Sequence, residues 1–292
     1  MTALQTQRMA PPRARARADI RSVLVHVEPT DEAAPRLRAA AELARDCGAT
    51  LLGVGVQKSP RLDMAEPYAV GVGPGLRELE AAVEFALARA EQMFRAAADG
   101  LASDWLALQD VPAPTLARLS RAADLIVAGG APLGLADAFR SADTADLVLM
   151  SGRPVLVAPP HGGRLVADSI VVAWKDSRES RRAVADSLPF LKAAREVRVV
   201  EVCVGGDAYA LAELHTFEVV ENLRRHGVKA EAKAIIAPPE SVVLELNQQA
   251  RAIDADLIVA GGYGHSRLGE WLLGGATREL LLAPERFTLF SH

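Results

Sequence analysis

Glycines crowd one stretch near the end of the chain, and their spacing suits the binding of a phosphate group. They stand at Gly261, Gly262, Gly264, Gly269, Gly274 and Gly275, and a hydroxyl residue follows at Thr277. Glycine lets backbone amides approach a phosphate closely, and a helix that starts near Ala276 would add the positive end of its dipole. The stretch therefore predicts a phosphate cradle that does not use a P-loop.

Cationic side chains stand close to this glycine loop and to one other short loop. His265 and Arg267 lie within the glycine stretch, and Lys175 opens the loop Lys175-Asp176-Ser177 that follows a predicted strand. In an open parallel sheet, ligands bind beyond the carboxyl ends of the strands where the winding direction reverses. We therefore expect a nucleotide site between the two loops, formed by Lys175, Asp176, Gly261, Gly264, His265, Gly274, Gly275 and Thr277.

The elements that must position these loops come as two copies of one unit. The octapeptide from Ala123 to Gly130 recurs letter for letter from Ala255 to Gly262, and the first strand, which starts at Ser22, recurs at Ser169. Such an internal repeat predicts two similar domains in one polypeptide. We place a basic tail at 1–18, a first domain at 19–160 and a second domain at 168–292, with a short linker rich in proline and glycine between the two domains.

Each copy alternates short apolar runs rich in β-branched residues with longer helical patterns, which is typical of a parallel sheet covered on both faces. The predicted class is α/β, with two tandem five-stranded Rossmann-like domains. Strands are expected near 23–27, 50–56, 105–109, 124–128 and 154–157 in the first copy, and near 169–174, 197–202, 230–236, 256–260 and 286–289 in the second. In the second copy, helices are expected near 178–194, 209–226, 241–252 and 276–282.

The first copy carries 15 extra residues between its first strand and the octapeptide. We place them near Pro60 to Gly75, where proline and glycine cluster, ahead of a helix over 76–98. The segment is interpreted as a connection, and a flap over a crevice is the alternative.

Composition excludes several classes of protein. The chain has 292 residues, half of them hydrophobic, and a formal net charge of -4. It has no basic excess for nucleic acid and no apolar run near the roughly 20 residues that a membrane span needs. The cysteines, Cys47 and Cys203, fall in different copies, so both are interpreted as free thiols, and we expect a reducing, cytoplasmic location. Residues 1–18 are rich in arginine and poor in apolar residues, which predicts disorder.

Catalytic and metal sites find little support in the sequence. The segment from Gly264 to Gly269 resembles the nucleophile elbow of a hydrolase around Ser266, but Leu268 stands where the elbow needs glycine, and only His292 follows as a histidine. The six histidines and two cysteines show no metal-ligand spacing. We expect no enzyme, and any hydrolysis of ATP would be slow and incidental.

The glycine stretch resembles the universal stress protein family, of the UspA type. Its nucleotide-binding members carry glycine, two residues, glycine, nine residues and glycine, followed by serine or threonine, and Gly261, Gly264 and Gly274 match this spacing. The resemblance covers nearly the whole chain and implies two domains of the adenine nucleotide alpha hydrolase-like fold in a tandem member. It also implies a stress-response protein that binds ATP, with Mg²⁺. The chain departs from the pattern at Gly275, where the hydroxyl residue stands in the family, and at Lys175, where an acidic residue stands.

In the first copy, the corresponding loop has lost most of these features. Gly129 corresponds to Gly261, but Pro132, Ala142 and Asp143 correspond to Gly264, Gly274 and Gly275. Proline removes an amide donor, and Asp143 would repel a phosphate. The first copy is therefore interpreted as a scaffold without nucleotide.

Two functions remain open at this stage. The first is a regulatory stress protein that binds ATP or a related nucleotide in the second copy. The second is an interaction or scaffold protein of the same fold without nucleotide, which contacts a protein partner. In either case the resemblance implies an internal pseudo-dimer through the last strands, Val155 to Val157 and Phe287 to Leu289, which would cover two exposed strand edges. Whether the chain also forms a homodimer is left open.

Overall fold

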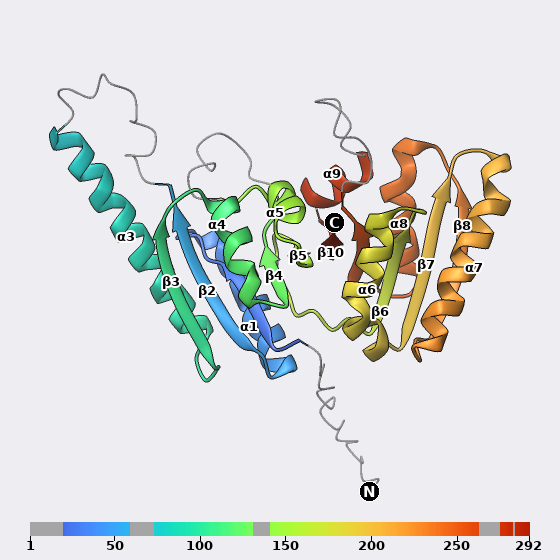
Figure 1. The fold of residues 1–292 in the computed structure, drawn as a ribbon, viewed down its shortest axis with the longest axis horizontal. Helices are drawn as coiled ribbons and strands as arrows, with labels where there is room; N and C mark the ends of the chain where they lie inside the picture. Colours follow the sequence, from blue (N-terminus) through green and yellow to red (C-terminus); the bar gives the residue numbers. More distant parts are fainter. Residues whose placement is uncertain (1–19, 59–72, 131–140, 263–274, 283) are drawn as a thin grey trace, which may run out of the picture.

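The chain folds as one ten-stranded sheet with helices on both faces (Figure 1). A computed structural model describes residues 20–58, 73–130, 141–262, 275–282 and 284–292. The predictions for the 1–18 tail, for most of the 60–75 segment and for Gly264, His265 and Gly274 lie outside the described residues. The strands follow the spatial order β3-β2-β1-β4-β5-β10-β9-β6-β7-β8, so each half contributes five neighbouring strands.

The first half alternates strands and helices as its sequence pattern predicts. Its strands are β1 (Ser22–His26), β2 (Thr50–Gln57), β3 (Ser103–Gln109), β4 (Leu125–Ala128) and β5 (Val155–Val157). Its helices are α1 (Ala34–Cys47), α3 (Gly73–Ala97), α4 (Pro112–Leu119) and α5 (Thr144–Met150). Helix α3 begins at Gly73, so the prediction that Gly73 to Gly75 belong to a connection is wrong. Its second residue is proline, whose fixed φ suits the first turn of a helix.

The second half repeats the pattern. Its strands are β6 (Ser169–Trp174), β7 (Glu196–Cys203), β8 (Ala230–Ile236), β9 (Leu257–Gly261) and β10 (Phe287–Ser291). Its helices are α6 (Arg178–Ala193), α7 (Tyr209–Arg225), α8 (Val242–Ala252) and α9 (Gly275–Leu282). In this half the observed strands and helices agree with the expected ones to within two residues at each end. The predicted α/β class with parallel sheets is confirmed.

The two halves join through their last strands. β5 and β10 pair in the antiparallel direction, with Leu156 opposite Leu289 and Val155 opposite Phe290, whereas every other strand pair is parallel. The predicted pairing of the two last strands is therefore confirmed. Because this pairing removes two strand edges, only β3 and β8 remain at the ends of the sheet.

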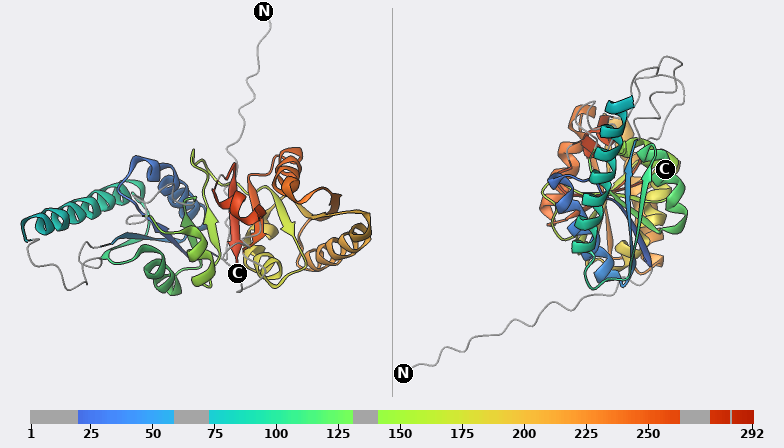
Figure 2. Two further views of the ribbon diagram at one scale, coloured as in Figure 1. Left: turned by 90° about the horizontal axis from the view of Figure 1, so that it is seen from above. Right: turned by 90° about the vertical axis from the view of Figure 1, so that its left-hand side faces the viewer.

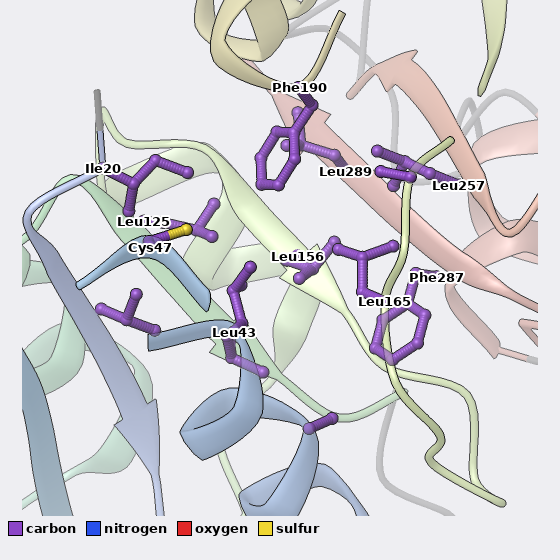
Figure 3. Close-up of a cluster of buried hydrophobic side chains, with 14 of the residues drawn as sticks. Ile20, Leu43, Cys47, Leu125, Leu156, Leu165, Phe190, Leu257, Phe287 and Leu289 are labelled. Carbon is purple, nitrogen blue, oxygen red and sulfur yellow. The ribbon is translucent and has the colours of Figure 1, made fainter. Parts of the chain in front are cut away.

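Helices lie on both faces of the sheet (Figure 2). Two apolar layers lie between the helices and the sheet, and both contain residues of the two halves. Phe94 of α3 and Phe190 of α6 belong to one layer, and Leu147 of α5 and Leu281 of α9 belong to the other. Near the junction, buried side chains from both halves gather in one cluster, labelled in Figure 3: Ile20, Leu43, Cys47, Leu125, Leu156, Leu165, Phe190, Leu257, Phe287 and Leu289. The halves therefore share their hydrophobic core.

The repeated octapeptide has a structural role at its aspartate. The carboxylate of Asp124 accepts hydrogen bonds from the backbone amides of Arg21 and Ser22 at 2.8 and 3.0 Å. In the second half, Asp256 accepts from the amides of Val166 and Ala167 at 2.6 and 3.0 Å. Each aspartate thus holds the segment that leads into the first strand of its own half.

Candidate functional site: the strand ends of the two halves

The winding of each half reverses between its first and fourth strands, so its crevice is expected at that point. In the second half these strands are β6 and β9, which lie side by side. The loop Lys175-Asp176-Ser177 follows β6, and Gly261 is the last residue of β9. A Cβ atom on Gly261 would lie 2.6 Å from the backbone nitrogen of Ser180, so the start of α6 lies directly against the end of β9. The structure therefore brings the two strand ends together.

A side-chain cap fixes the start of α6 beside the crevice. The Ser177 hydroxyl accepts a hydrogen bond from the backbone amide of Ser180 at 3.2 Å, as expected for an N-cap residue. The Ser180 hydroxyl in turn accepts from the backbone amide of Lys175 at 3.3 Å. These bonds hold the backbone of the Lys175–Ser177 loop, whereas the side chain of Lys175 is exposed.

Asp176 has a partner within the protein. Its carboxylate lies 2.5 Å from an Nη atom of Arg181, and both side chains are more than half exposed. A ligand that used Asp176 as an acceptor would compete with this ion pair. An exposed pair of this kind contributes little to stability, so the competition would cost little.

The C-terminal histidine lies at the start of the glycine loop. Nδ1 of His292 lies 3.0 Å from the carbonyl oxygen of Gly262, and Nε2 lies 3.3 Å from Nη2 of Arg178. Beside them, the buried Glu179 carboxyl is subject to opposing effects on its pKa. Burial acts to raise it, but hydrogen bonds from its own amide and from Ser177, together with the charge of Arg178, hold it below its usual value.

The described glycines of the predicted cradle play different roles. Gly261 permits the close contact with α6, and a Cβ atom on Gly262 would lie 2.6 Å from Cγ1 of Val148 in the other half. Both are therefore packing glycines. Gly275, in contrast, begins α9 with no atom of a described residue within 4 Å of the position that a Cβ atom would take, and Thr277 is half-buried in the same helical turn. Among the described residues, nothing fills the space at Gly275 at the start of α9.

In the first half, an internal ion pair occupies the corresponding strand ends. Nη2 of Arg36 lies 2.6 Å from Oε2 of Glu28, and the two side chains are 11% and 13% exposed. A Cβ atom on Gly129 would lie 2.2 Å from Nη1 of Arg36, so the guanidinium lies directly against the end of β4. Sequence reasoning missed this pair, although its signal was present: at the repeat offset, Glu28 and Arg36 correspond to Lys175 and Ala183.

Burial and charge set the titration of this pair and of its neighbour His26. Burial acts to raise the pKa of the Glu28 carboxyl, but Arg36, His26 and a hydrogen bond from Ser141 lower it to about 2. Burial lowers the pKa of His26, and the charge of Glu28 opposes this shift. Glu28 is therefore ionised and His26 neutral at neutral pH.

The helix that follows the first-half loop also satisfies its own donors. The Asp143 carboxylate accepts from the backbone amides of Ala145 and Asp146 at 2.8 and 3.3 Å, which caps α5. These are amides that a phosphate would otherwise use. Thr144 is also engaged, because its hydroxyl donates to the carbonyl oxygen of Gly129 at 2.7 Å.

Other types of site find no support in the described part of the chain. There, no group of three or more histidine, cysteine, aspartate or glutamate side chains could hold a metal ion. Among the same residues, no helix has the length and apolar character needed to cross a bilayer. Cys47 and Cys203 are both buried and are not joined in a disulfide.

Known structures of the same size share the whole architecture. A universal stress protein from Archaeoglobus fulgidus DSM 4304 matches with a TM-score of 0.67 at 14% sequence identity, over 94% of this chain and 97% of the other. A putative universal stress protein from Pseudomonas aeruginosa UCBPP-PA14 matches with a TM-score of 0.59 at 17% identity, over 95% of each chain. No protein-family model and no curated protein matches the sequence. The chain thus has the fold of the universal stress proteins in its tandem form, with two α/β halves joined through their last strands.

Proposed function

We propose that the chain is a non-catalytic regulatory protein that binds ATP or a related nucleotide in its second half, with the first half as a scaffold. The phosphates would lie over the start of α9, against the backbone of Gly275 and near Thr277. Lys175 and Asp176 would lie toward the ribose or base. Gly264, His265 and Gly274 complete the proposed site from the sequence pattern alone.

The difference between Asp143 and Gly275 carries this proposal. The two residues correspond in the repeat, and each stands at the start of the helix that follows its loop. Asp143 caps its helix with its own carboxylate, whereas glycine has no side chain with which to do so. The N-terminal end of α9 therefore lacks the capping acid that α5 has at its N-terminal end. Because that end of a helix carries a partial positive charge, this difference favours an anionic ligand at α9.

The Arg36–Glu28 pair supports the assignment of the first half as a scaffold. The guanidinium of Arg36 lies at the end of β4, in the place where a ligand would bind, and Glu28 already neutralises its charge. At the corresponding position of the second half, Ala183 has no charged group. One nucleotide per chain is therefore expected.

The test is calorimetric titration of the purified, ligand-free protein with ATP and magnesium, comparing the natural chain with Gly275→Asp. The substitution introduces the acid of the first half, which would cap α9 and repel a phosphate. We expect binding at one site per chain in the natural protein and at least tenfold weaker binding in the variant, which is about 1.4 kcal/mol. Asp143→Gly is the matched control and should leave the affinity unchanged.

The second candidate function is an interaction protein that binds no nucleotide. The observation that favours it is the chemistry of the first loop, where Lys175 stands in place of an acid. It predicts no heat with ATP up to millimolar concentration and an unshifted melting curve. Those two results together would overturn the nucleotide proposal.

A further inference from the structure

A groove lies between α6 and α7 in the second half, beside the strand-end loops. Its volume is about 630 Å³, which is within the range of small-molecule sites. Leu188 and the adjacent apolar residues of α6 form one side, Val219 and its neighbours on α7 form the other, and Trp174 of β6 also lines the groove. It runs along the two helices and meets the strand-end loop at Asp176. The two sides of the groove thus offer an apolar surface for the apolar part of a small ligand.

The sheet beneath the groove places an aromatic ring and an acid side by side. Trp174 and Glu201 are partners in the register of β6 and β7, so their side chains project from the same face of the sheet. Trp174 lies in the apolar layer that α6 and α7 cover, so this shared face is the one beneath the groove. An indole ring beside a carboxylate is a favourable environment for an organic cation.

Two polar groups in this region are incompletely satisfied. Nε1 of Trp174 is buried and has no hydrogen-bond partner among the described residues, although the residue is 91% buried and such groups are normally paired. The Glu201 carboxylate is 14% exposed, and its hydrogen-bonding neighbour in the described chain is Nδ1 of His215, at 3.3 Å from Oε2. A carboxylate has room for about four donors, so Glu201 can accept more.

The charges around the groove favour a cationic ligand over an anionic one. Arg181 is neutralised by Asp176, whereas Glu218, one turn beyond His215 on α7, adds an acid to the lining. Glu201 lies on the sheet face beneath the lining, where its carboxylate contacts Nδ1 of His215. His226 and Asn222 stand at the other end of the same side. Burial raises the pKa of the Glu201 carboxyl above its usual value, although the charge and hydrogen bond of His215 and, more weakly, the charge of Lys175 oppose this shift.

We propose that the groove between α6 and α7 binds a small amphipathic amine, with its apolar body between Leu188 and Val219 and its ammonium group directed toward Glu201 and Glu218 beside the indole of Trp174. This ligand differs from the nucleotide in charge and lies against different elements. The two sites share the Asp176–Arg181 pair, so an occupied groove would act on the strand-end loop through that pair.

Three compounds with the same naphthyl body test the charge preference: 2-(1-naphthyl)ethylamine, 2-(1-naphthyl)ethanol and 3-(1-naphthyl)propionate. Each is titrated into the full chain in a calorimeter at pH 7.5 without nucleotide. We expect the amine to bind at least about tenfold more tightly than the alcohol and the acid, since each close charge pair contributes about a decade or more. Equal affinities for the amine and the alcohol, or no binding of the amine up to millimolar concentration, would overturn the proposal.

Variants locate the site on the protein. Glu201→Gln keeps the size of the side chain but removes its charge, and it should weaken amine binding about tenfold while leaving the alcohol unchanged. Ala185→Trp, at an exposed position of α6 in the groove lining, should block all three compounds. Glu213→Gln is the matched control, because Glu213 is an exposed acid of α7 outside the groove lining. Unchanged amine affinity in both Glu201→Gln and Ala185→Trp, with their melting temperatures intact, would show that the amine binds elsewhere and that the assignment is wrong.

Discussion

Arg36 lies against the end of β4 and forms a buried ion pair with Glu28, with 2.6 Å between Nη2 and Oε2. The same guanidinium lies 3.4 Å from the carbonyl oxygen of His26, so it links the end of β1 to the start of α1. In the second half the corresponding residues, Lys175 and Ala183, cannot form this pair. The two copies therefore share a fold but differ in the chemistry of their strand ends, and this difference yields the first two predictions.

Removing one partner of the pair should cost far more than removing both. Arg36→Met leaves a buried carboxylate without its cation, and we expect a loss of about 3 kcal/mol in the free energy of unfolding. The double variant with Glu28→Gln should recover most of that loss, because no uncompensated charge remains. Urea unfolding of the single and double variants measures the coupling, and additive losses would show that the pair does not act as a unit.

Stability should fall in acid because of Glu28. Its pKa is about 2 in the folded protein, below the ordinary value of 4.5, so its contribution is fully present above about pH 5 and is lost as the pH falls from 4.5 toward 2. The shift corresponds to about 3 kcal/mol. His26 acts in the same direction from a higher pH, since its pKa is lowered in the folded state and the unfolded chain takes up the proton first. Melting temperatures between pH 7 and pH 3 should fall less steeply in Glu28→Gln than in the natural protein.

Substitution by alanine should change the stability of the fold at Gly261 but not at Gly275, the two described glycines at the ends of the predicted loop. A Cβ atom on Gly261 would lie 2.6 Å from one backbone atom and 2.7 Å from another, so Gly261→Ala should destabilise the fold by about 1–3 kcal/mol or more. At Gly275 no described residue has an atom within 4 Å of that position, so Gly275→Ala should leave the melting temperature nearly unchanged. Thermal unfolding followed by circular dichroism compares the two variants. A stable Gly261→Ala protein would contradict the contact with α6.

The repeated aspartates should have equivalent effects in the two halves. Asp256→Ala removes the acceptor for two backbone amides, and we expect a loss of about 1.5–3 kcal/mol, since the acceptor is charged. Hydrogen exchange should then become fast at the amides of Val166 and Ala167 and stay slow in β1. Asp124→Ala is the matched variant and should expose the amides of Arg21 and Ser22 instead. Retained protection at Val166 in the first variant would show that the segment is held by other contacts.

The sequence by itself determined the class and the repeat, whereas the pairing of the two last strands was implied by the resemblance to the universal stress proteins. Apolar runs of strand length, helical periodicity and the recurring octapeptide are local signals, because each reflects how a short segment buries its own side chains. The Ser177 cap belongs to the same group, since its bond to the Ser180 amide spans three residues. For the same reason, the boundary at Gly73 was misplaced: proline and glycine occur both in connections and in the first turn of a helix.

Only the tertiary structure decided which residues act together. It separated Gly261, which packs against α6, from Gly275, where no described residue fills the Cβ position, although both are glycines of one sequence pattern. It also placed Arg36 against Gly129, and Trp174 beside Glu201 under a groove formed by two helices. These relationships join segments that are far apart in the chain, and no periodicity within either segment encodes them. They depend on how the sheet is ordered and on what space the packed helices leave, which is fixed only when the whole chain has folded.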